Sequence, residues 1–316
     1  ALLDMVRLRL LQVDFKGSLL VVGDFLQLPP VVKGSSSIVF SFESESWKRF
    51  NFYPFVLQGS YRTHEENFLT LLNAVRYGEL TEENTNQLDN MIILNSNHQE
   101  MTWLFGKNSS AQKYNKERLN QLNGDLIEIK TDITVHGTHI IDKDIERFLQ
   151  ESRIESFLYL KLGAPILFTR NSWNYYNGEK GYILSIEEEA IWVKKENGLS
   201  VKVERVSTTK SRWNEHSGVL VEELLMTLSH FPLVLAFAIT IHKSQGMSLV
   251  DYCIDSNEIF APSQFYVALS RAVSSSRVWL GVSNRGWKQL CFVNSKARSF
   301  VHMLEKITDK RADTSF

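Results

Sequence analysis

A short apolar run in the last third of the chain, residues 233–239, gives way abruptly to side chains that carry hydroxyl, imidazole, ammonium and amide groups. Such a run is typical of a strand buried on both faces of a parallel sheet, and it is too short to cross a bilayer. Open α/β sheets bind ligands at the carboxyl ends of their strands, so the pattern predicts a ligand site here. For any one of these residues an ordinary polar surface loop is the simpler interpretation. The string consists of Thr240, His242, Lys243, Ser244, Gln245 and Gly246.

A second strand end with polar groups lies near the N-terminus. Residues 19–23 predict a short apolar strand, and Asp24 and Gln27 follow it. Pro29 and Pro30 exclude a helix or an inner strand beyond that point. A carboxylate and an amide therefore lie at a rigid turn, which is either purely structural or part of a ligand site.

Arg62 precedes a predicted helix at a position suited to binding phosphate. Thr63 and Glu66 have capping-box spacing, and the helix that they predict runs to a stop signal at Gly78. Anions collect at helix N-termini, and a guanidinium there can add a bidentate grip. The alternative for Arg62 is an ordinary surface arginine.

A second helix with a terminal arginine is predicted over residues 262–271, with Pro262 near its start. Gln264, Ala268 and Arg271 fall on one face of this helix, so an amide lies at one end and a guanidinium at the other. A chance pair of Gln and Arg on a helix is common, and this spacing alone assigns no role.

The middle of the chain predicts a small β-barrel. Apolar alternation marks strands over residues 182–186, 191–194 and 201–206, and Asn197-Gly198 between two of them is a strong hairpin signal. The preceding segment combines cations, amides and rings, which suits neutralisation of a nucleic-acid backbone together with base stacking. Rings in such a turn serve local packing equally well. The segment contains Arg170, Asn171, Trp173, Tyr175, Tyr176 and Lys180.

These stretches resemble, in the same order, motifs III to VI of superfamily-one helicases of the Pif-type and RecD-like branch. The resemblance covers most of the chain, and the middle segment is similar to the Src-homology-three-like insert of that branch. One departure is Thr63, which stands where the family usually has Gln. The matching stretches are residues 23–31 (GDFLQLPPV), Tyr61-Arg62 with Asn73, Arg76 and Gly78, residues 238–246 (AITIHKSQG), and residues 262–271 (PSQFYVALSR).

The resemblance implies an ATP-dependent DNA helicase that uses ATP and Mg²⁺ and moves 5′ to 3′ on single-stranded DNA. It implies three catalytic residues: Arg62 and Arg271, which act at the nucleotide γ-phosphate, and Gln27, which lies between the γ-phosphate and the bound strand. Cofactor contacts fall to Gln245, Gly246 and Gln264, and no metal ligand is implied within this chain. Contacts to the DNA strand fall to Thr240, His242, Lys243, Ser248, Arg170, Asn171 and Tyr176.

The implied fold class is α/β, a RecA-like parallel-sheet domain with an inserted small β-barrel and the end of a first RecA-like domain. The expected remnant of the first domain is residues 1–56. Residues 57–163 and 230–316 would form the second RecA-like domain, and residues 164–229 the barrel.

The chain contains neither a Gly-x-x-x-x-Gly-Lys-Ser/Thr loop nor an Asp-Glu pair after a strand. These elements cradle the β-phosphate and hold Mg²⁺ in such enzymes. The chain also begins at Ala1, inside a helical pattern. We therefore expect a fragment that is inactive alone. Two alternatives stay open: a non-catalytic DNA-binding or regulatory module with a helicase-derived fold, and the motor subunit of a recombination nuclease complex.

Composition limits the possible partners less than the motifs do. The 316 residues have a formal net charge of -1, so a nucleic-acid partner requires a local basic strip. Cys253 and Cys291 are expected to be buried free thiols in a reducing compartment. We expect no membrane contact and a bacterial cytoplasmic location, or a nuclear or mitochondrial one in a eukaryote. Other DNA repair or recombination subunits are further candidate partners.

Overall fold

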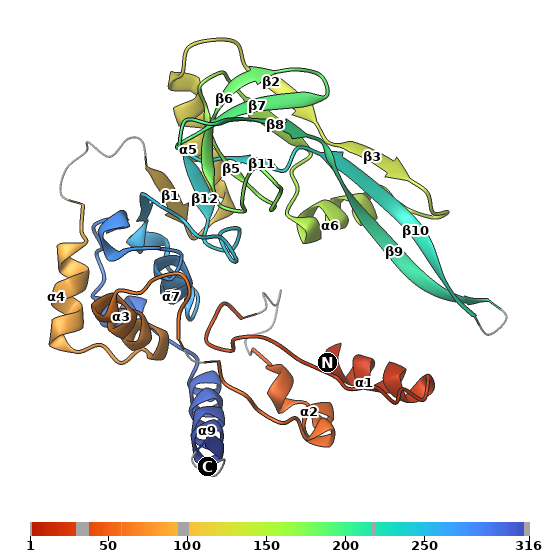
Figure 1. Cartoon of the computed structure of the whole chain (residues 1–316), viewed down its shortest axis with the longest axis vertical. Coiled ribbons are helices and arrows are strands. Elements are labelled where there is room, and N and C mark those ends of the chain that lie inside the picture. The colour runs from red at the N-terminus through yellow and green to blue at the C-terminus, as the bar shows by residue number, and fades with distance from the viewer. Residues whose placement is uncertain (1, 30–37, 58, 94–100, 217–218, 313–316) are drawn as a thin grey trace. The chain divides into compact units, whose positions relative to one another are not determined.

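The computed structural model describes residues 2–29, 38–57, 59–93, 101–216 and 219–312. Contacts within the chain define two compact units (Figure 1). Unit 1 comprises residues 1–94 and 254–316, and unit 2 comprises residues 95–253. None of the described helices is both long enough and apolar enough to span a membrane.

Unit 1 is mainly helical. Ile92 forms a parallel bridge with Leu280 of its strand β14. In α3, Phe68, Leu71 and Val75 are buried and Leu72 is half-buried, and the predicted stop is confirmed, since Gly78 ends the helix with φ 70°. The elements are α1 (Leu2–Gln12), η1 (Ser41–Glu43), α2 (Glu45–Phe50), α3 (Glu66–Tyr77), α4 (Glu82–Asn90), η2 (Ser256–Glu258), α7 (Gln264–Leu269), η3 (Ser275–Arg277), β14 (Val278–Leu280), α8 (Trp287–Leu290) and α9 (Ser295–Ala312).

The predicted capping box at the start of α3 is wrong. The N-cap residue is Glu65, which makes no side-chain cap, and the Thr63 hydroxyl instead accepts a hydrogen bond from the Glu65 N–H at 3.3 Å. The Glu65 carboxylate accepts hydrogen bonds from the N–H and hydroxyl of Ser275. Hydrogen bonds from Ser274 and Ser275 lower the pKa of Glu65. Glu65 thus connects the start of α3 to the segment after Arg271.

The predicted strand over residues 19–23 is also wrong. These residues pair with no described strand, and Leu20 and Val22 are 85% and 79% exposed. A strand requires a hydrogen-bonded neighbour, and apolar composition alone does not supply one. In the aromatic-rich segment that follows, Trp47 packs edge to face against Phe25 and against Phe300 of α9, whereas Tyr53 and Phe55 are exposed.

Unit 2 contains a parallel pair of strands, β1 (Thr102–Phe105) and β12 (Ala238–Thr240), and the helix α5 (Asn108–Gln121) packs beside both (Figure 1). In the strand order, β13 (Tyr252–Ile254) follows β1 on the side opposite β12. Cys253 of β13 and Cys291 in unit 1 are both buried, and neither forms a disulfide in the described structure.

The apolar run that begins at residue 233 is not one strand. Its first part is β11 (Leu233–Leu235), which pairs antiparallel with β5 (Pro165–Phe168). Ala236 and Phe237 then lead the chain out of that sheet and into β12. An apolar run reports burial but not the number of sheets that share it, so the single parallel strand expected here is corrected to two strands in two sheets.

An antiparallel sheet of order β11-β5-β6-β7-β8 forms the middle of unit 2. Its strands β6 (Lys180–Ile186), β7 (Ala190–Lys195) and β8 (Ser200–Glu204) confirm the predicted alternation. The predicted hairpin at Asn197-Gly198 is present, with Gly198 at φ 87°. One core cluster includes Phe168, Ile183, Ile191, Val193 and Val203.

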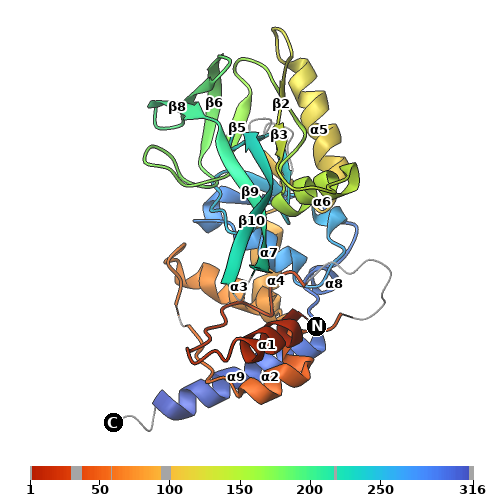
Figure 2. The ribbon, with the colours of Figure 1, turned by 90° about the vertical axis from the view of Figure 1, so that its right-hand side faces the viewer.

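The sequence pattern did not predict the two longest strands of unit 2. β9 (Val206–His216) and β10 (Val219–His230) pair over their whole lengths as a ribbon, and β3 (Asp132–Val135) pairs with the other edge of β10 (Figures 1 and 2). Charged and apolar residues are mixed along the ribbon, so it lacks the clean alternation that signals a strand. The helix α6 (Asp142–Ser152) and the pair β2 (Ile127–Lys130) and β4 (Phe157–Leu160) complete the unit.

Candidate functional site

In unit 1 the two arginines predicted to act on phosphate converge on one residue, Ser270. The Arg62 guanidinium donates to the Ser270 carbonyl at 2.7 Å, and the Arg271 guanidinium donates to the Ser270 hydroxyl at 2.9 Å. Arg271 is buried and also donates to the Val267 carbonyl at 2.8 Å. Ser270, the C-cap residue after α7 (Gln264–Leu269), therefore holds both guanidinium groups.

Further charged groups gather around the ring of Tyr266. Burial raises the pKa of the Tyr266 hydroxyl, and the charges of Arg76, Asp24, Arg271 and Arg62 also act on it. Arg76 forms an ion pair with Asp24 at 3.2 Å, although its Nε has no hydrogen-bond partner among the described residues. Neither Tyr266 nor the pairing of Asp24 with Arg76 was signalled by the sequence, because their positions are far apart in the chain.

Gln27 lies beside this cluster through Asp24. Its side-chain amide donates to the Asp24 carboxylate at 3.4 Å, and the same carboxylate accepts from the Leu26 N–H at 2.9 Å. Hydrogen bonds to Asp24 therefore stabilise the turn that contains Gln27. Pro30 and Val31, the last residues of the matching stretch, lie outside the described residues.

Gln264 is fully buried at the start of α7 and has a structural task. Its carbonyl oxygen accepts hydrogen bonds from the N–H groups of Phe260 and Ala261, at 2.8 and 3.0 Å. Its amide nitrogen has no hydrogen-bond partner in the described structure. A buried, unsatisfied N–H is costly and leaves a donor available for a ligand.

Chemically, the cluster in unit 1 suits an anion. Three guanidinium groups against one carboxylate, Asp24, form a positively charged site that matches phosphoryl oxygens. Among the described residues, no group of three or more His, Cys, Asp or Glu side chains that could hold a metal ion is found.

In unit 2 the polar string after β12 is a tight turn over residues 241–246. The Thr240 hydroxyl accepts a hydrogen bond from the Lys243 N–H at 3.3 Å, and the buried Ser244 hydroxyl donates to the Ile241 carbonyl at 2.8 Å. Gly246 occupies the left-handed region at φ 84°. Burial, followed by the charge of Arg153, lowers the pKa of His242, so its imidazole is neutral at pH 7.

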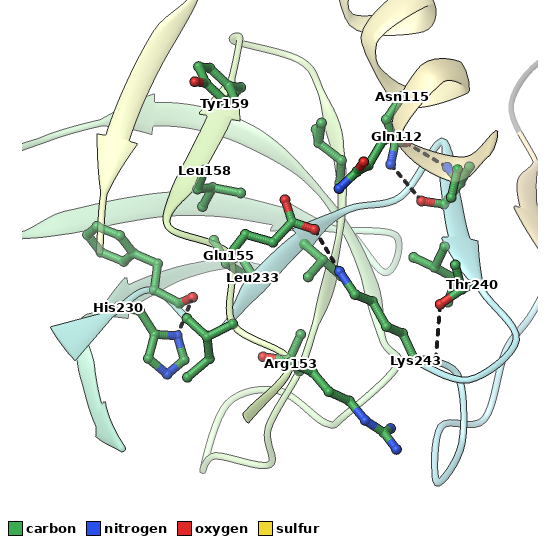
Figure 3. A pocket seen from close by; sticks show the side chains of 18 of the residues that line it. Gln112, Asn115, Arg153, Glu155, Leu158, Tyr159, His230, Leu233, Thr240 and Lys243 are labelled. Atoms are coloured by element: carbon green, nitrogen blue, oxygen red, sulfur yellow. Dashed lines mark hydrogen bonds and ion pairs between the residues drawn. The ribbon is translucent and has the colours of Figure 1, made fainter. Parts of the chain in front are cut away.

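Asn115 of α5 fixes the start of β12. Its amide donates to the Ala238 carbonyl at 2.7 Å and accepts from the Ala238 N–H at 2.8 Å (Figure 3). A side-chain amide thus satisfies both backbone groups of one strand residue. These two hydrogen bonds fix the position of α5 relative to the first residue of β12.

A cavity of about 770 Å³ opens beside this turn, entirely within unit 2 (Figure 3). The basic residues that line it come from five separate segments, and among the described residues of the lining Glu155 is the only acidic one. The local basic strip that a nucleic-acid partner requires is therefore present in a chain of net charge -1. The basic lining residues are Lys116, Lys130, Arg153, Arg170 and Lys243.

A series of hydrogen bonds in the wall of the cavity positions Arg170. Its guanidinium donates to the Thr208 hydroxyl at 2.7 Å, and that hydroxyl lies 3.2 Å from His230 Nε2. His230 Nδ1 lies 3.0 Å from the Phe231 carbonyl and must donate to it, so Nε2 of the neutral ring accepts from Thr208. Burial lowers the pKa of His230, which favours this neutral form.

The loop that carries Arg170, residues 169–179, is fixed on its inner side. The Tyr175 ring is buried and stacks on Phe168 with centroids 4.2 Å apart, which settles that ring as packing. Lys195 holds the loop by donating to the Asn174 carbonyl at 2.7 Å and pairing with Glu179 at 3.0 Å. The outer side chains of this loop, which are exposed, are those of Arg170, Asn171, Trp173 and Tyr176.

The predicted site residues thus divide between the two units. Gln27, Arg62, Arg271 and Gln264 lie in unit 1, and the first three surround Tyr266 directly or through Asp24. Of those in unit 2, the cavity lining includes Thr240, Lys243, Gln245 and Arg170 but not His242, Gly246, Ser248, Asn171 or Tyr176.

Comparisons with known proteins find relatives of one kind. The chain is 35% identical over 286 residues to the ATP-dependent DNA helicase Pif1 of Campylobacter jejuni, a match that covers 86% of this chain. Its fold is similar to that of unliganded Pif1 from Bacteroides sp, with a TM-score of 0.75 and 26% identity over 90% of this chain and 66% of that one. These matches support a Pif1-type helicase of superfamily one.

A Pif1 structure from Bacteroides in complex with ADP-AlF3 and single-stranded DNA matches at 26% identity, with a TM-score of 0.58 and coverage of 90% of this chain and 66% of that one. The chain spans 64% of the length of the Campylobacter Pif1. No protein-family model matches it. The Pif1 structures confirm the predicted α/β, RecA-like class, which the β1–α5–β12 arrangement of unit 2 exemplifies.

Proposed function

We propose that this chain is part of an ATP-dependent DNA helicase of the Pif1 type that binds single-stranded DNA in the basic cavity of unit 2. The observation that supports this best is the charge of that cavity, where five cationic side chains face one carboxylate. Phosphate neutralisation supplies most of the affinity of proteins for single strands. The Bacteroides Pif1 that was crystallised with single-stranded DNA shares this fold.

The DNA contacts that we assign are of two kinds. Arg170 and Lys243 line the cavity and would neutralise phosphates, while Thr240 would contribute a hydroxyl from the end of β12. Neutral His242 and Ser248 would add hydrogen bonds from the turn. Asn171 and the exposed ring of Tyr176 would contact the strand from the neighbouring loop.

In unit 1 we assign the ATP γ-phosphate to Arg62 and Arg271, with Gln27 reporting its presence through Asp24. Hydrogen bonds to Ser270 hold both guanidinium groups in place, and preorganised donors of this kind stabilise the charge that develops on a phosphoryl group. Gln264 would offer its unsatisfied amide N–H to the nucleotide. We also assign Gln245 and Gly246 to the coupling between nucleotide and strand.

ATP supplies the free energy for the proposed movement, in the 5′ to 3′ direction. Because the 316 residues contain no phosphate loop and no Asp-Glu pair, the β-phosphate and Mg²⁺ need residues outside them. The same proposal keeps residues 1–56 as the end of a first RecA-like domain, residues 164–229 as the barrel insert, and residues 57–163 with 230–316 as the second RecA-like domain.

The strand-binding part can be tested on the chain itself. We expect it to bind a fluorescently labelled oligothymidine, with an affinity that falls as salt increases. Arg170→Gln should weaken binding and lower the slope of log K against log[salt] by about 0.7, the value for one phosphate contact on a single strand.

The matched control is Lys113→Gln, which removes a cation from an exposed position of α5 outside the cavity lining. It should change neither the affinity nor the slope beyond error. Equal effects of the two substitutions, or no binding of the oligonucleotide by the wild-type chain, would contradict the assignment of the strand to this cavity.

A further inference from the structure

The acidic residue of the basic cavity lies directly on one of the basic ones. The Lys243 ammonium is 2.6 Å from the Glu155 carboxylate, and Figure 3 shows the lysine side chain extending from the turn after β12 to meet it. Every other cationic side chain of the lining faces a cavity whose described residues offer no further carboxylate. The pairing therefore neutralises the one lysine that the polar string contributes.

Glu155 is held in place independently of Lys243. The buried Thr131 donates through its hydroxyl to the Glu155 carbonyl at 2.7 Å, and its N–H donates to the Ser156 carbonyl at 2.9 Å. Arg153, two residues earlier, donates to the His242 carbonyl at 2.9 Å and so ties this segment to the turn. The position of the segment does not depend on the ion pair, which leaves the ion pair available for another purpose.

We propose that Glu155 competes with the DNA backbone for Lys243 and so limits how tightly the strand is held. This inference rests on the proposed binding of single-stranded DNA in the cavity. In the strand-free state the Lys243 ammonium pairs with the Glu155 carboxylate. When a strand is bound, the carboxylate stays beside the ammonium and competes with the phosphate for it.

The exposure of the pair makes this exchange easy. The Lys243 and Glu155 side chains are 25% and 47% exposed, so water screens their attraction and the pair is weak. An ammonium on a flexible stem can rotate to a new acceptor without a fixed bidentate geometry. A carboxylate at this place therefore lowers affinity without blocking the site.

Such a competitor suits a protein that must release its strand repeatedly. A cavity with five cations and no acid would hold phosphates for long times, because affinity differences appear mainly in the dissociation rate. Glu155 offers Lys243 a substitute partner each time a phosphate leaves. Its expected effect is thus faster dissociation of the strand rather than slower binding.

The test compares Glu155→Gln with wild type in the 316-residue chain, using fluorescence anisotropy and stopped-flow release of a labelled oligothymidine. We expect Glu155→Gln to bind roughly twofold to fivefold more tightly at low salt, mainly through slower release. The gain should shrink as salt rises. The isosteric amide keeps the volume of the side chain, and a thermal unfolding curve verifies that the variant is folded.

The matched control is Glu151→Gln. It removes the same charge four residues away on α6, where Glu151 pairs with Arg147 and Lys210 outside the cavity lining. Equal tightening by both substitutions would show a general charge effect and overturn the proposal, as would unchanged or weaker binding by Glu155→Gln.

A double-mutant cycle isolates the pair. In a Lys243→Gln background, Glu155→Gln should tighten binding less than it does in wild type, because the competition for the ammonium is gone. An undiminished gain would overturn the proposal. If wild type fails to bind the oligothymidine, the proposed function fails with it. If wild type binds and Lys243→Gln weakens binding but Glu155→Gln changes nothing, only the role of Glu155 is refuted.

Discussion

Arg62 and Arg271 are held by different groups of the same residue, Ser270, the first by its carbonyl and the second by its hydroxyl. The two arginines are more than 200 positions apart in the chain, and a hydrogen bond links Arg62 to Ser270 across a separation of 208 residues. Two guanidinium groups brought so close would repel each other without an anion or the carboxylate of Asp24 nearby. The arrangement therefore favours a ligand with several negative oxygens.

Replacement of Arg271 should abolish ATP hydrolysis. In an intact helicase that contains this chain, Arg271→Ala is expected to lower kcat by roughly 10³–10⁵, the range for loss of an arginine finger. Affinity for single-stranded DNA should change little, because Arg271 lies in unit 1 and the basic cavity in unit 2. Steady-state ATPase assays and anisotropy measure the two effects. Arg298→Ala, on the partly exposed face of α9, is the control, and surviving turnover in Arg271→Ala would show that the assignment is wrong.

A close backbone contact makes Gly178 harder to replace than Gly198. Both have φ 87°, but a Cβ at Gly178 would lie 2.8 Å from the Ser248 carbonyl and 2.9 Å from Met247 Cβ, whereas at Gly198 nothing lies within 4 Å. Gly198→Ala should therefore cost only the strain of its backbone, roughly 1–2 kcal/mol. Gly178→Ala should cost roughly 1–3 kcal/mol more. Urea unfolding measures the free-energy cost of each substitution. Equal costs would mean that the loop of Gly178 can move away from Met247 and Ser248 without loss of stability.

Asn115 should matter for stability more than its half-buried surface suggests. Asn115→Ala leaves the N–H and carbonyl of Ala238 without their side-chain partners and is expected to cost roughly 1–3 kcal/mol in the free energy of unfolding. Asn120→Ala, an exposed position of the same helix, is the control and should stay within about 0.5 kcal/mol of wild type. A cost for Asn115→Ala no larger than that of the control would refute its role in fixing β12.

Acid should destabilise the fold through His230. Burial lowers the folded-state pKa of His230, and the neighbouring charges of Arg170 and Arg205 act in the same direction against the Phe231 carbonyl. The unfolded state then binds more protons below about pH 6.5, so stability falls as pH drops through that value and is fully present above it. We expect thermal unfolding to show that His230→Gln loses less stability than wild type when the pH is lowered from about pH 7.5 to about pH 5.5.

The control for that experiment is His64→Gln, because the His64 side chain is exposed. It should retain the full pH dependence of the wild type. His242, whose pKa is lowered by burial and by Arg153, contributes in the same direction and stays present in both variants. An identical pH dependence in wild type and His230→Gln would mean that the hydrogen bonds between Arg170, Thr208 and His230 tolerate a protonated His230 imidazole.

Local signals in the sequence determined much of the molecule. The stop of α3 at Gly78 and the Asn197-Gly198 hairpin both follow from turn chemistry within a few residues. The motif stretches also carried the resemblance to Pif-type helicases. Such features are readable because their physical causes are short-range: a helix face, a cap or a two-residue turn depends on near neighbours in the chain.

Tertiary structure alone decided where the apolar run of residues 233–239 divides between two sheets and which cations share a cavity. Lys116 lies on the helix α5, far in the sequence from Arg153 and Lys243, yet all three line one cavity. The net charge of -1 hides this concentration, and no periodicity reports it. A pattern shows which side of an element is buried but not which neighbour buries it, so the pairing of Lys243 with Glu155 and the meeting of two arginines at Ser270 emerge only when distant segments pack.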